Sequence, residues 1–130
     1  DFDAAFARAR WRGEQPGGDR IPGAVEGVAQ VALTLDNLGP WSGALRLRYF
    51  GPRPLIEDNS VRSNASAILN GRIRKDLLVE LEVFNLANRR DSAIDYFYAS
   101  RMSGESEARE DVHFHPIEPR SARVTLTRNW

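Results

Sequence analysis

Apolar and polar residues alternate with a period of two along most of this chain, which predicts β-strands. The run Trp41–Phe50 is the clearest, because Trp, Gly, Leu, Leu and Tyr share one face while Ser, Ala and two Arg share the other. The run Ala4–Arg12 is also compatible with a helix, because alanine and arginine are good helix formers. Similar runs predict six strands: Ala4–Arg12, Ala24–Leu35, Trp41–Phe50, Asn64–Arg74, Leu78–Leu86 and Arg120–Trp130.

The connectors between these strands differ in length in a regular order. Residues 36–40 and 75–77 predict tight turns, whereas residues 13–23, 51–62 and 92–119 form long connections. The order is therefore long, short, long, short, long. An up-and-down antiparallel meander would place both short turns at one end and the long loops at the other, as outer-membrane barrels do.

The alternation alone leaves open which face of such a sheet meets water. In a soluble β-sheet module the Val/Leu/Ala face is the core, whereas in a membrane barrel that face meets lipid and the polar face lines the lumen. The polar face is rich in arginine, with glutamate on the fifth strand. A turn at 75–77 predicts that Arg72 faces Glu80 and that Asn70 faces Glu82. The lumen-facing ladder expected in a barrel comprises Arg46, Arg48, Arg72, Glu80 and Glu82.

The amino-acid composition narrows the classes of binding partner and of chemistry that are compatible with this chain. Lys+Arg and Asp+Glu are balanced at 18 each, so no overall charge favours nucleic acid. Cysteine is absent, which excludes disulfides and thiolate chemistry. The first residues show no signal-peptide pattern, and no apolar run is long enough for a membrane-spanning helix.

The apolar face favours lipid contact. It is rich in alanine and glycine, which pack poorly in a soluble core, and its aromatic residues lie near strand ends, as in the interfacial girdles of barrels: Trp11, Trp41, Tyr49 and Trp130. On the first strand this face comprises Ala5, Ala7, Ala9 and Trp11, with Phe6, Arg8, Arg10 and Arg12 opposite. The last strand ends on an aromatic residue, and Val124, Leu126 and Trp130 resemble the signal recognised by the barrel-insertion machinery.

Two longer segments carry a family resemblance. The run "LEVFNLANRR" (Leu81–Arg90), a long loop and "EPRSARVTLTRNW" (Glu118–Trp130) together resemble the C-terminal end of TonB-dependent outer-membrane receptors. The segments "RIPGAVEGVAQVAL", "LRLRYFGPRP" and "DNSVRSNAS" resemble the preceding strands and loops of such receptors, so the similarity covers essentially all 130 residues. Ala87 departs from the family pattern, which has phenylalanine at that place.

The resemblance implies an all-β fold: about six strands that form the last part of a 22-stranded transmembrane barrel, with short periplasmic turns and long extracellular loops. Residues 1–130 would be the C-terminal barrel segment, and the plug domain and earlier strands would lie outside this sequence. It further implies a place in the outer membrane of a Gram-negative bacterium and uptake of a scarce nutrient such as an iron–siderophore complex, energised through TonB. The implied partners are outer-membrane lipid, the rest of the barrel with its plug, and the insertion machinery.

Candidate ligand contacts lie in the last long loop. His113 and His115 alternate with Phe114 in "DVHFHP", so they share one side of an extended segment with Asp111, a spacing compatible with a metal or a metal complex. Tyr96 and Tyr98 form a candidate aromatic platform for a substrate. Packing within the loop is the alternative for both groups, and no resident metal or cofactor is expected.

Catalysis has no support in the sequence. A Gly-rich phosphate loop, a Gly-x-Ser-x-Gly turn and a His-Glu-x-x-His helix are all absent. The paired carboxylates Glu80 and Glu82 face arginines that keep them ionised, which favours a structural role. The sequence therefore predicts a transporter segment and not an enzyme, with a soluble β-sheet binding module as the alternative.

Overall fold

The computed structural model describes residues 1–13, 16–76 and 79–128. Within these ranges the chain contains no helix, and therefore none that could cross a membrane. Eight strands are present: β1 (Phe2–Phe6), β2 (Gly27–Leu38), β3 (Trp41–Phe50), β4 (Ser66–Lys75), β5 (Val79–Phe84), β6 (Ser92–Ser100), β7 (Arg109–Pro116) and β8 (Ser121–Leu126).

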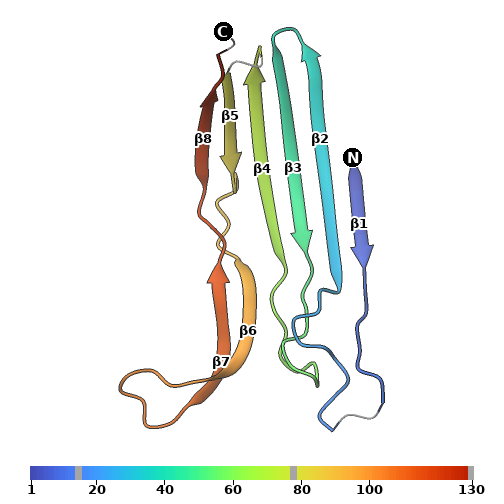
Figure 1. Ribbon diagram of the computed structural model, residues 1–130, viewed down its shortest axis with the longest axis vertical. Helices are drawn as coiled ribbons and strands as arrows, with labels where there is room; N and C mark the ends of the chain where they lie inside the picture. Colours follow the sequence, from blue (N-terminus) through green and yellow to red (C-terminus); the bar gives the residue numbers. More distant parts are fainter. Residues whose placement is uncertain (14–15, 77–78, 129–130) are drawn as a thin grey trace.

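The strands form two antiparallel sheets (Figure 1). Six strands lie in the order β1-β2-β3-β4-β5-β8, and β6 pairs with β7 in a separate two-stranded sheet. The predicted all-β antiparallel fold is confirmed, and the six strands of the larger sheet correspond to the six predicted ones, whereas β6 and β7 were not predicted. The larger sheet is open, because β1 and β8 each pair on one side only within the described residues.

The two ends of the larger sheet differ as the connector lengths predict. The β2–β3 turn, the end of β4, the start of β5 and the end of β8 lie at the upper end in Figure 1, whereas the three long connections lie at the lower end. The ends are called the short-turn end and the loop end below. The third long connection contains β6 and β7, which extend the molecule beyond the loop end of β5 and β8.

Strand boundaries were predicted well only where turn residues flank both ends. Trp41–Phe50 is confirmed to the residue, between Gly39–Pro40 and Gly51–Pro52. β2 runs to Leu38, through part of the predicted turn, with a register shift after Leu35. The last predicted strand is observed as Ser121–Leu126, and Trp130 lies outside the described residues.

The prediction for the first strand was wrong in extent and in face. β1 ends at Phe6, because its last partner, Gly27, is the first residue of β2. Phe6 lies on the apolar face and Ala5 on the polar face, since Ala5 pairs with Val28. Arg8, Arg10 and Arg12 therefore belong to the loop that follows.

The predicted cross-strand pairs of β4 and β5 were also wrong. The register pairs Lys75 with Val79, so the turn lies one residue later than predicted. The shift of the turn by one residue moves the pairing by two positions, which preserves the faces and changes the partners. Arg72 consequently faces Glu82, and Glu80 faces Arg74.

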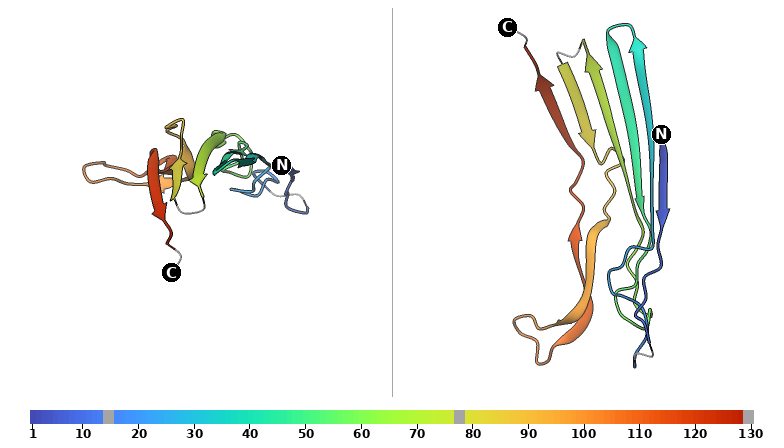
Figure 2. Two further views of the ribbon diagram at one scale, coloured as in Figure 1. Left: turned by 90° about the horizontal axis from the view of Figure 1, so that it is seen from above. Right: turned by 45° about the vertical axis from the view of Figure 1, so that its right-hand side comes forward.

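The larger sheet is a single layer (Figure 2), and no described segment covers either face of it. The buried apolar side chains of the described part of the chain are Pro54 and Leu55, and both lie in the loop between β3 and β4 and not beneath the sheet. A soluble sheet of this size requires a covered apolar face. The fold therefore leaves its apolar surface available to something other than its own residues.

Candidate functional site

The first candidate surface is the apolar face of the six-stranded sheet. Adjacent strands align their aliphatic side chains in rows, such as Leu33 opposite Leu45 and Ile73 opposite Leu81. Leu33 and Ile73 are each 54% exposed, although they lie mid-sheet. Val124 and Leu126 of the expected assembly signal extend this face at the β8 edge and are also exposed. An apolar surface of this extent marks an interaction site, with protein or with membrane.

The opposite face carries the predicted ladder of charged residues. Glu80 accepts two hydrogen bonds from Arg74, at 2.8 and 2.6 Å, and Arg72 approaches it diagonally at 4.0 Å. Arg123 of β8 lies 3.0 Å from Glu82. Three neighbouring strands are thus joined by ion pairs, which were predicted in type but not in their specific partners.

Two members of the ladder remain without a protein partner. Arg46 and Arg48 lie on β3 and are exposed, and neither makes a hydrogen bond or an ion pair within residues 1–13, 16–76 and 79–128. Their cross-strand neighbours are Ala32, Gln30, Asn70 and Ile68. The polar face therefore presents uncompensated positive charge at its centre.

The predicted ligand contacts of the last long loop come together on one face of the β6–β7 hairpin. Tyr96 pairs with His113, and Tyr98 pairs with Asp111. The rings contact diagonally: Tyr98 stacks on His113 at 3.9 Å between centroids, and Tyr96 meets His115 edge-on at 6.4 Å. These ring contacts fit packing within the loop, which was the alternative to ligand binding.

A metal centre is not formed by these residues as described. Asp111 lies within β7, where its carboxylate accepts a hydrogen bond from the amide of the next residue, Val112, at 2.7 Å. Nowhere in the described ranges do three or more His, Cys, Asp or Glu side chains gather as metal ligands. Nε2 of His113 is buried without a hydrogen-bond partner, so the stacked ring is held by packing.

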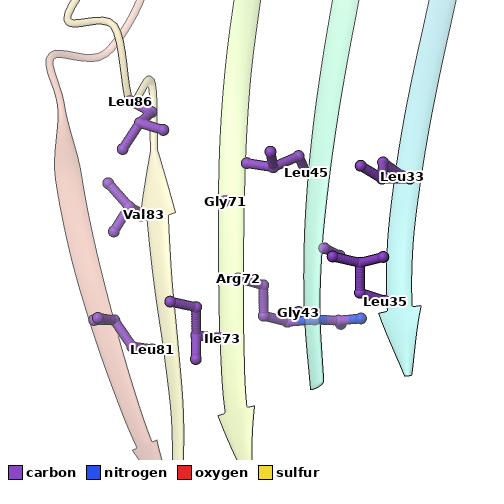
Figure 3. A pocket seen from close by; sticks show the side chains of 11 residues that line it. Leu33, Leu35, Gly43, Leu45, Gly71, Arg72, Ile73, Leu81, Val83 and Leu86 are labelled. Atoms are coloured by element: carbon purple, nitrogen blue, oxygen red, sulfur yellow. The ribbon is translucent and has the colours of Figure 1, made fainter. Parts of the chain in front are cut away.

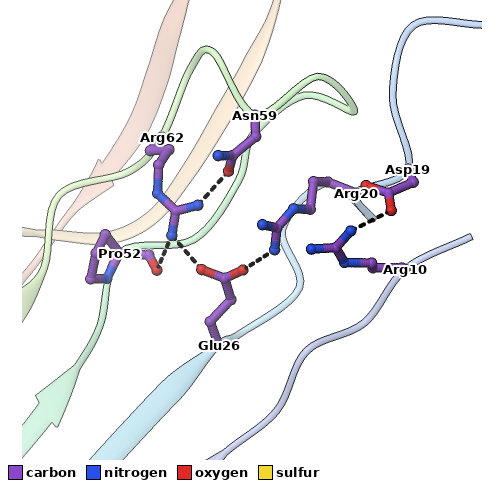
Figure 4. A network of polar contacts seen from close by, with 7 residues as sticks. All are labelled: Arg10, Asp19, Arg20, Glu26, Pro52, Asn59 and Arg62. Carbon is purple, nitrogen blue, oxygen red and sulfur yellow. Dashed lines mark hydrogen bonds and ion pairs between the residues drawn. The ribbon is translucent and has the colours of Figure 1, made fainter.

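A network of charged residues joins two of the long loops at the loop end (Figure 4). Glu26, which precedes β2, binds Arg20 at 2.6 Å from its own loop and Arg62 from the β3–β4 loop. Arg62 also donates to Asn59 and to the Pro52 carbonyl. Glu26 carries no local sequence signal of this role, because its partner Arg62 is 36 residues away along the chain.

The same two loops approach closely through their backbones. The Arg20 amide donates to the Glu57 carbonyl at 3.1 Å. Gly18 has a φ of +125°, and a Cβ at this position would lie 2.2 Å from the same carbonyl oxygen. Glycine is therefore required here both by conformation and by space. The loop end is a packed unit and not a set of independent loops.

The charge network makes the packing of the loops dependent on pH. The hydrogen bond from Arg62 is the largest cause that lowers the pKa of Glu26; the charges of Arg62, Arg20 and Arg8 lower it further, and desolvation opposes them. A carboxylate whose pKa is lowered by folding stabilises the fold at neutral pH, and this contribution is lost as the pH falls through the folded-state pKa. We expect Glu26→Gln to reduce the free energy of unfolding by about 1 kcal/mol at pH 7.

The difference between the wild-type chain and Glu26→Gln should begin to shrink as the pH falls through the ordinary pKa of a glutamate, about 4.3, and should disappear only below the lowered folded-state pKa of Glu26. Urea titrations of both chains in detergent micelles between pH 7 and pH 3 measure it, and the other carboxylates cancel in the difference. A difference that stays constant over this range would show that the ion pairs of Glu26 contribute nothing.

A buried asparagine stabilises the junction between β5, β8 and the β6–β7 hairpin. Asn85 is 3% exposed, and its side-chain amide donates to the carbonyls of Arg89 and Glu118, both at 2.9 Å. Its side-chain oxygen accepts from the Arg89 amide, and its backbone amide donates to Asn70. Asn85 and Asn88 have φ of +48° and +51°, a conformation that asparagine tolerates better than most residues.

The role of Asn85 was not predicted from the sequence, although a local signal for it is present. The pair of asparagines three residues apart is a local signal for left-handed turns, and it marks the end of β5 two residues before the predicted boundary. Asn88 completes the junction, because its side chain accepts a hydrogen bond from the Arg120 amide just before β8.

Comparison with known proteins identifies no relative. No family model, curated protein or solved structure matches this chain. The functional conclusion therefore rests on the surfaces and the junction described above.

Proposed function

We propose that this chain is the C-terminal part of the barrel of a TonB-dependent outer-membrane receptor. In this proposal the six-stranded sheet is a sector of a closed 22-stranded barrel, and its two open edges pair with the barrel's other strands. The apolar face contacts outer-membrane lipid, and the arginine-rich face looks onto a plug domain inside the lumen. The receptor takes up a scarce nutrient such as an iron–siderophore complex, energised through TonB.

The uncovered apolar face is the single observation that carries this proposal. On the apolar face of β2–β5 and β8, thirteen described hydrophobic side chains are more than a third exposed, and the sheet has no second layer: Val31, Leu33, Leu35, Leu38, Trp41, Leu45, Leu47, Tyr49, Ile73, Val79, Leu81, Val124 and Leu126. In water this surface and the two unpaired edges favour aggregation. In a membrane both problems disappear, because acyl chains cover the face and strand pairing closes the edges.

The arrangement of the loops supports the same orientation. The β2–β3 turn and the end of β8 lie at one end, and the packed loops lie at the other, as the periplasmic and extracellular ends of a barrel do. Trp41 lies at the short-turn end, where an aromatic girdle is expected. The β6–β7 hairpin with its tyrosines and histidines then projects outside the membrane, where a substrate first contacts the receptor.

A folding experiment tests membrane association directly. We expect the purified chain to aggregate in aqueous buffer and to give a β-sheet circular dichroism spectrum when it is refolded into detergent micelles. The reason is that micelles supply the apolar surroundings that the described residues do not supply. A soluble, monomeric β-sheet protein in buffer alone would contradict the proposal and favour a binding module that covers its apolar face.

A further inference from the structure

The apolar face is not flat but contains a groove (Figure 3). Gly43 and Gly71 lack side chains on adjacent strands, and between leucines of β2, β3 and β5 they leave a hollow of about 320 Å³. The register places Leu35, Gly43, Ile73 and Leu81 in one row, and Leu33, Leu45, Gly71 and Val83 in the next. Apart from Arg72, every residue that lines the groove is apolar.

One charged side chain lies beside this groove on the same face. Lys75 occupies the next row toward the short-turn end, between Trp41 and Val79. Its ammonium group lies 5.7 Å from the centroid of the Trp41 ring, and it has no carboxylate partner within the described ranges. It is the only charged residue among the described apolar-face positions of β1–β5 and β8.

The distance between the charge of Lys75 and the apolar groove matches the distance between the headgroup and the acyl chain of an anionic phospholipid. At about 3.4 Å per residue, Ile73 lies roughly 7 Å from Lys75 and Gly71 roughly 14 Å from it. A lysine at the membrane interface with an aromatic neighbour binds anionic headgroups, while the groove begins at the depth of the first acyl methylenes.

Resting on the proposed membrane orientation, we infer that this groove is a specific binding site for one anionic phospholipid. One acyl chain fills the hollow above Gly43 and Gly71, and the headgroup phosphate pairs with Lys75. The short-turn end assigns the lipid to the leaflet on that side of the membrane. An empty hollow would forfeit dispersion contacts that an ordered chain supplies.

Replacing Gly71 by a larger residue tests the lipid site without straining the backbone. A Cβ on Gly71 would have its nearest contact at 3.5 Å, with Cδ2 of Leu45, which is an ordinary van der Waals distance. Gly71→Leu therefore fills the groove without a clash between the new Cβ and its neighbours. Ala67→Leu adds the same side chain on the same face of β4, outside the groove, and is the matched control.

The experiment refolds the full chain in detergent micelles, titrates it with phosphatidylglycerol and counts retained lipids by native mass spectrometry. We expect one retained lipid on the wild-type chain and on Ala67→Leu, and about tenfold weaker retention on Gly71→Leu, which displaces roughly two methylene groups. Lys75→Gln should lower the preference for phosphatidylglycerol over phosphatidylcholine about fivefold.

Equal retention by Gly71→Leu and the wild type would overturn the inference, as would a groove occupied only by detergent or by a second copy of the chain. A chain that is a soluble, monomeric β-sheet protein in buffer without micelles contradicts the proposed function itself. A chain that folds and retains no discrete phospholipid contradicts the lipid site alone.

Discussion

Leu33→Arg is expected to lower the free energy of unfolding of the micelle- or vesicle-bound chain by about 2–4 kcal/mol, the cost of an arginine near the bilayer midplane on the lipid face of a barrel. Leu33 lies mid-strand in β2, opposite Leu45, and points away from the charged ladder. A guanidinium group there must leave water or distort the bilayer around it. Urea titration followed by tryptophan fluorescence measures the loss.

Thr34→Arg is the matched control, because it introduces the same side chain one residue further along, on the polar face. The cross-strand neighbour of Thr34 on β3 is Ala44, and the Thr34 side chain is exposed. We therefore expect the free energy of unfolding to change by no more than about 0.5 kcal/mol. Equal effects of the two substitutions would mean that both faces meet the same solvent. A larger effect at Thr34 would place the apolar face in water and the polar face inside.

Asn85→Ala is expected to cost about 3–5 kcal/mol, since it removes a buried side chain with three hydrogen bonds and places alanine at a positive φ. The carbonyls of Arg89 and Glu118 lose their donor, so the junction between β5, β8 and the hairpin loosens. Chemical denaturation in micelles measures the loss of stability, and amide exchange at residues 86–91 should accelerate.

Two variants separate the causes at this junction. Asn85→Gly removes the hydrogen bonds but accepts the positive φ, so it should be less damaging than Asn85→Ala by about 1 kcal/mol. Asn88→Gly keeps the left-handed turn and loses one exposed hydrogen bond, so we expect a cost below about 1 kcal/mol. A near-neutral Asn85→Ala would show that the junction is held by strand pairing alone.

The alternation of residue types predicted the six-stranded meander because period-two patterning is a local property of each strand. It succeeded best for Trp41–Phe50, where both flanks carry Gly-Pro pairs. It failed for β1, because Ala and Arg alternate equally well in a loop and the end of β1 depends on where its partner β2 begins. The register of β4 and β5 failed because the turn near Lys75 lies one residue later than its composition suggested.

The β6–β7 hairpin was missed for a different reason. In β6 apolar residues occur at both parities, as in Ile94, Tyr96 and Phe97, so no alternation appears there. In β7 His113 and His115 do alternate with Phe114, but this short run was interpreted as an extended segment of the loop. The enrichment in aromatic and β-branched residues was the remaining signal for strands. The ring cluster of the hairpin then followed from register, which placed the predicted tyrosines and histidines on one face.

The contacts that organise the loop end join residues far apart in sequence and could not be predicted from local patterns. Glu26 meets Arg62 from another loop, and Arg53 lies 3.6 Å from the buried Asp95 of β6. In the sequence these residues are charged side chains in predicted loops, and such residues ordinarily indicate a solvated surface. Only the folded arrangement shows that these charges pair.

The proposed function depends on the orientation of the sheet in the membrane. This orientation can be measured with labels on single introduced cysteines, because the chain contains no cysteine of its own. Spin labels on single cysteines introduced at Leu47 and at Arg46, adjacent on β3 and on opposite faces, report collision with oxygen in lipid and with a nickel chelate in water. We predict that the label at position 47 collides mainly with oxygen, while the label at position 46 is shielded from lipid. The reverse ordering, or equal access of the nickel chelate to both labels in vesicles, would contradict the membrane orientation.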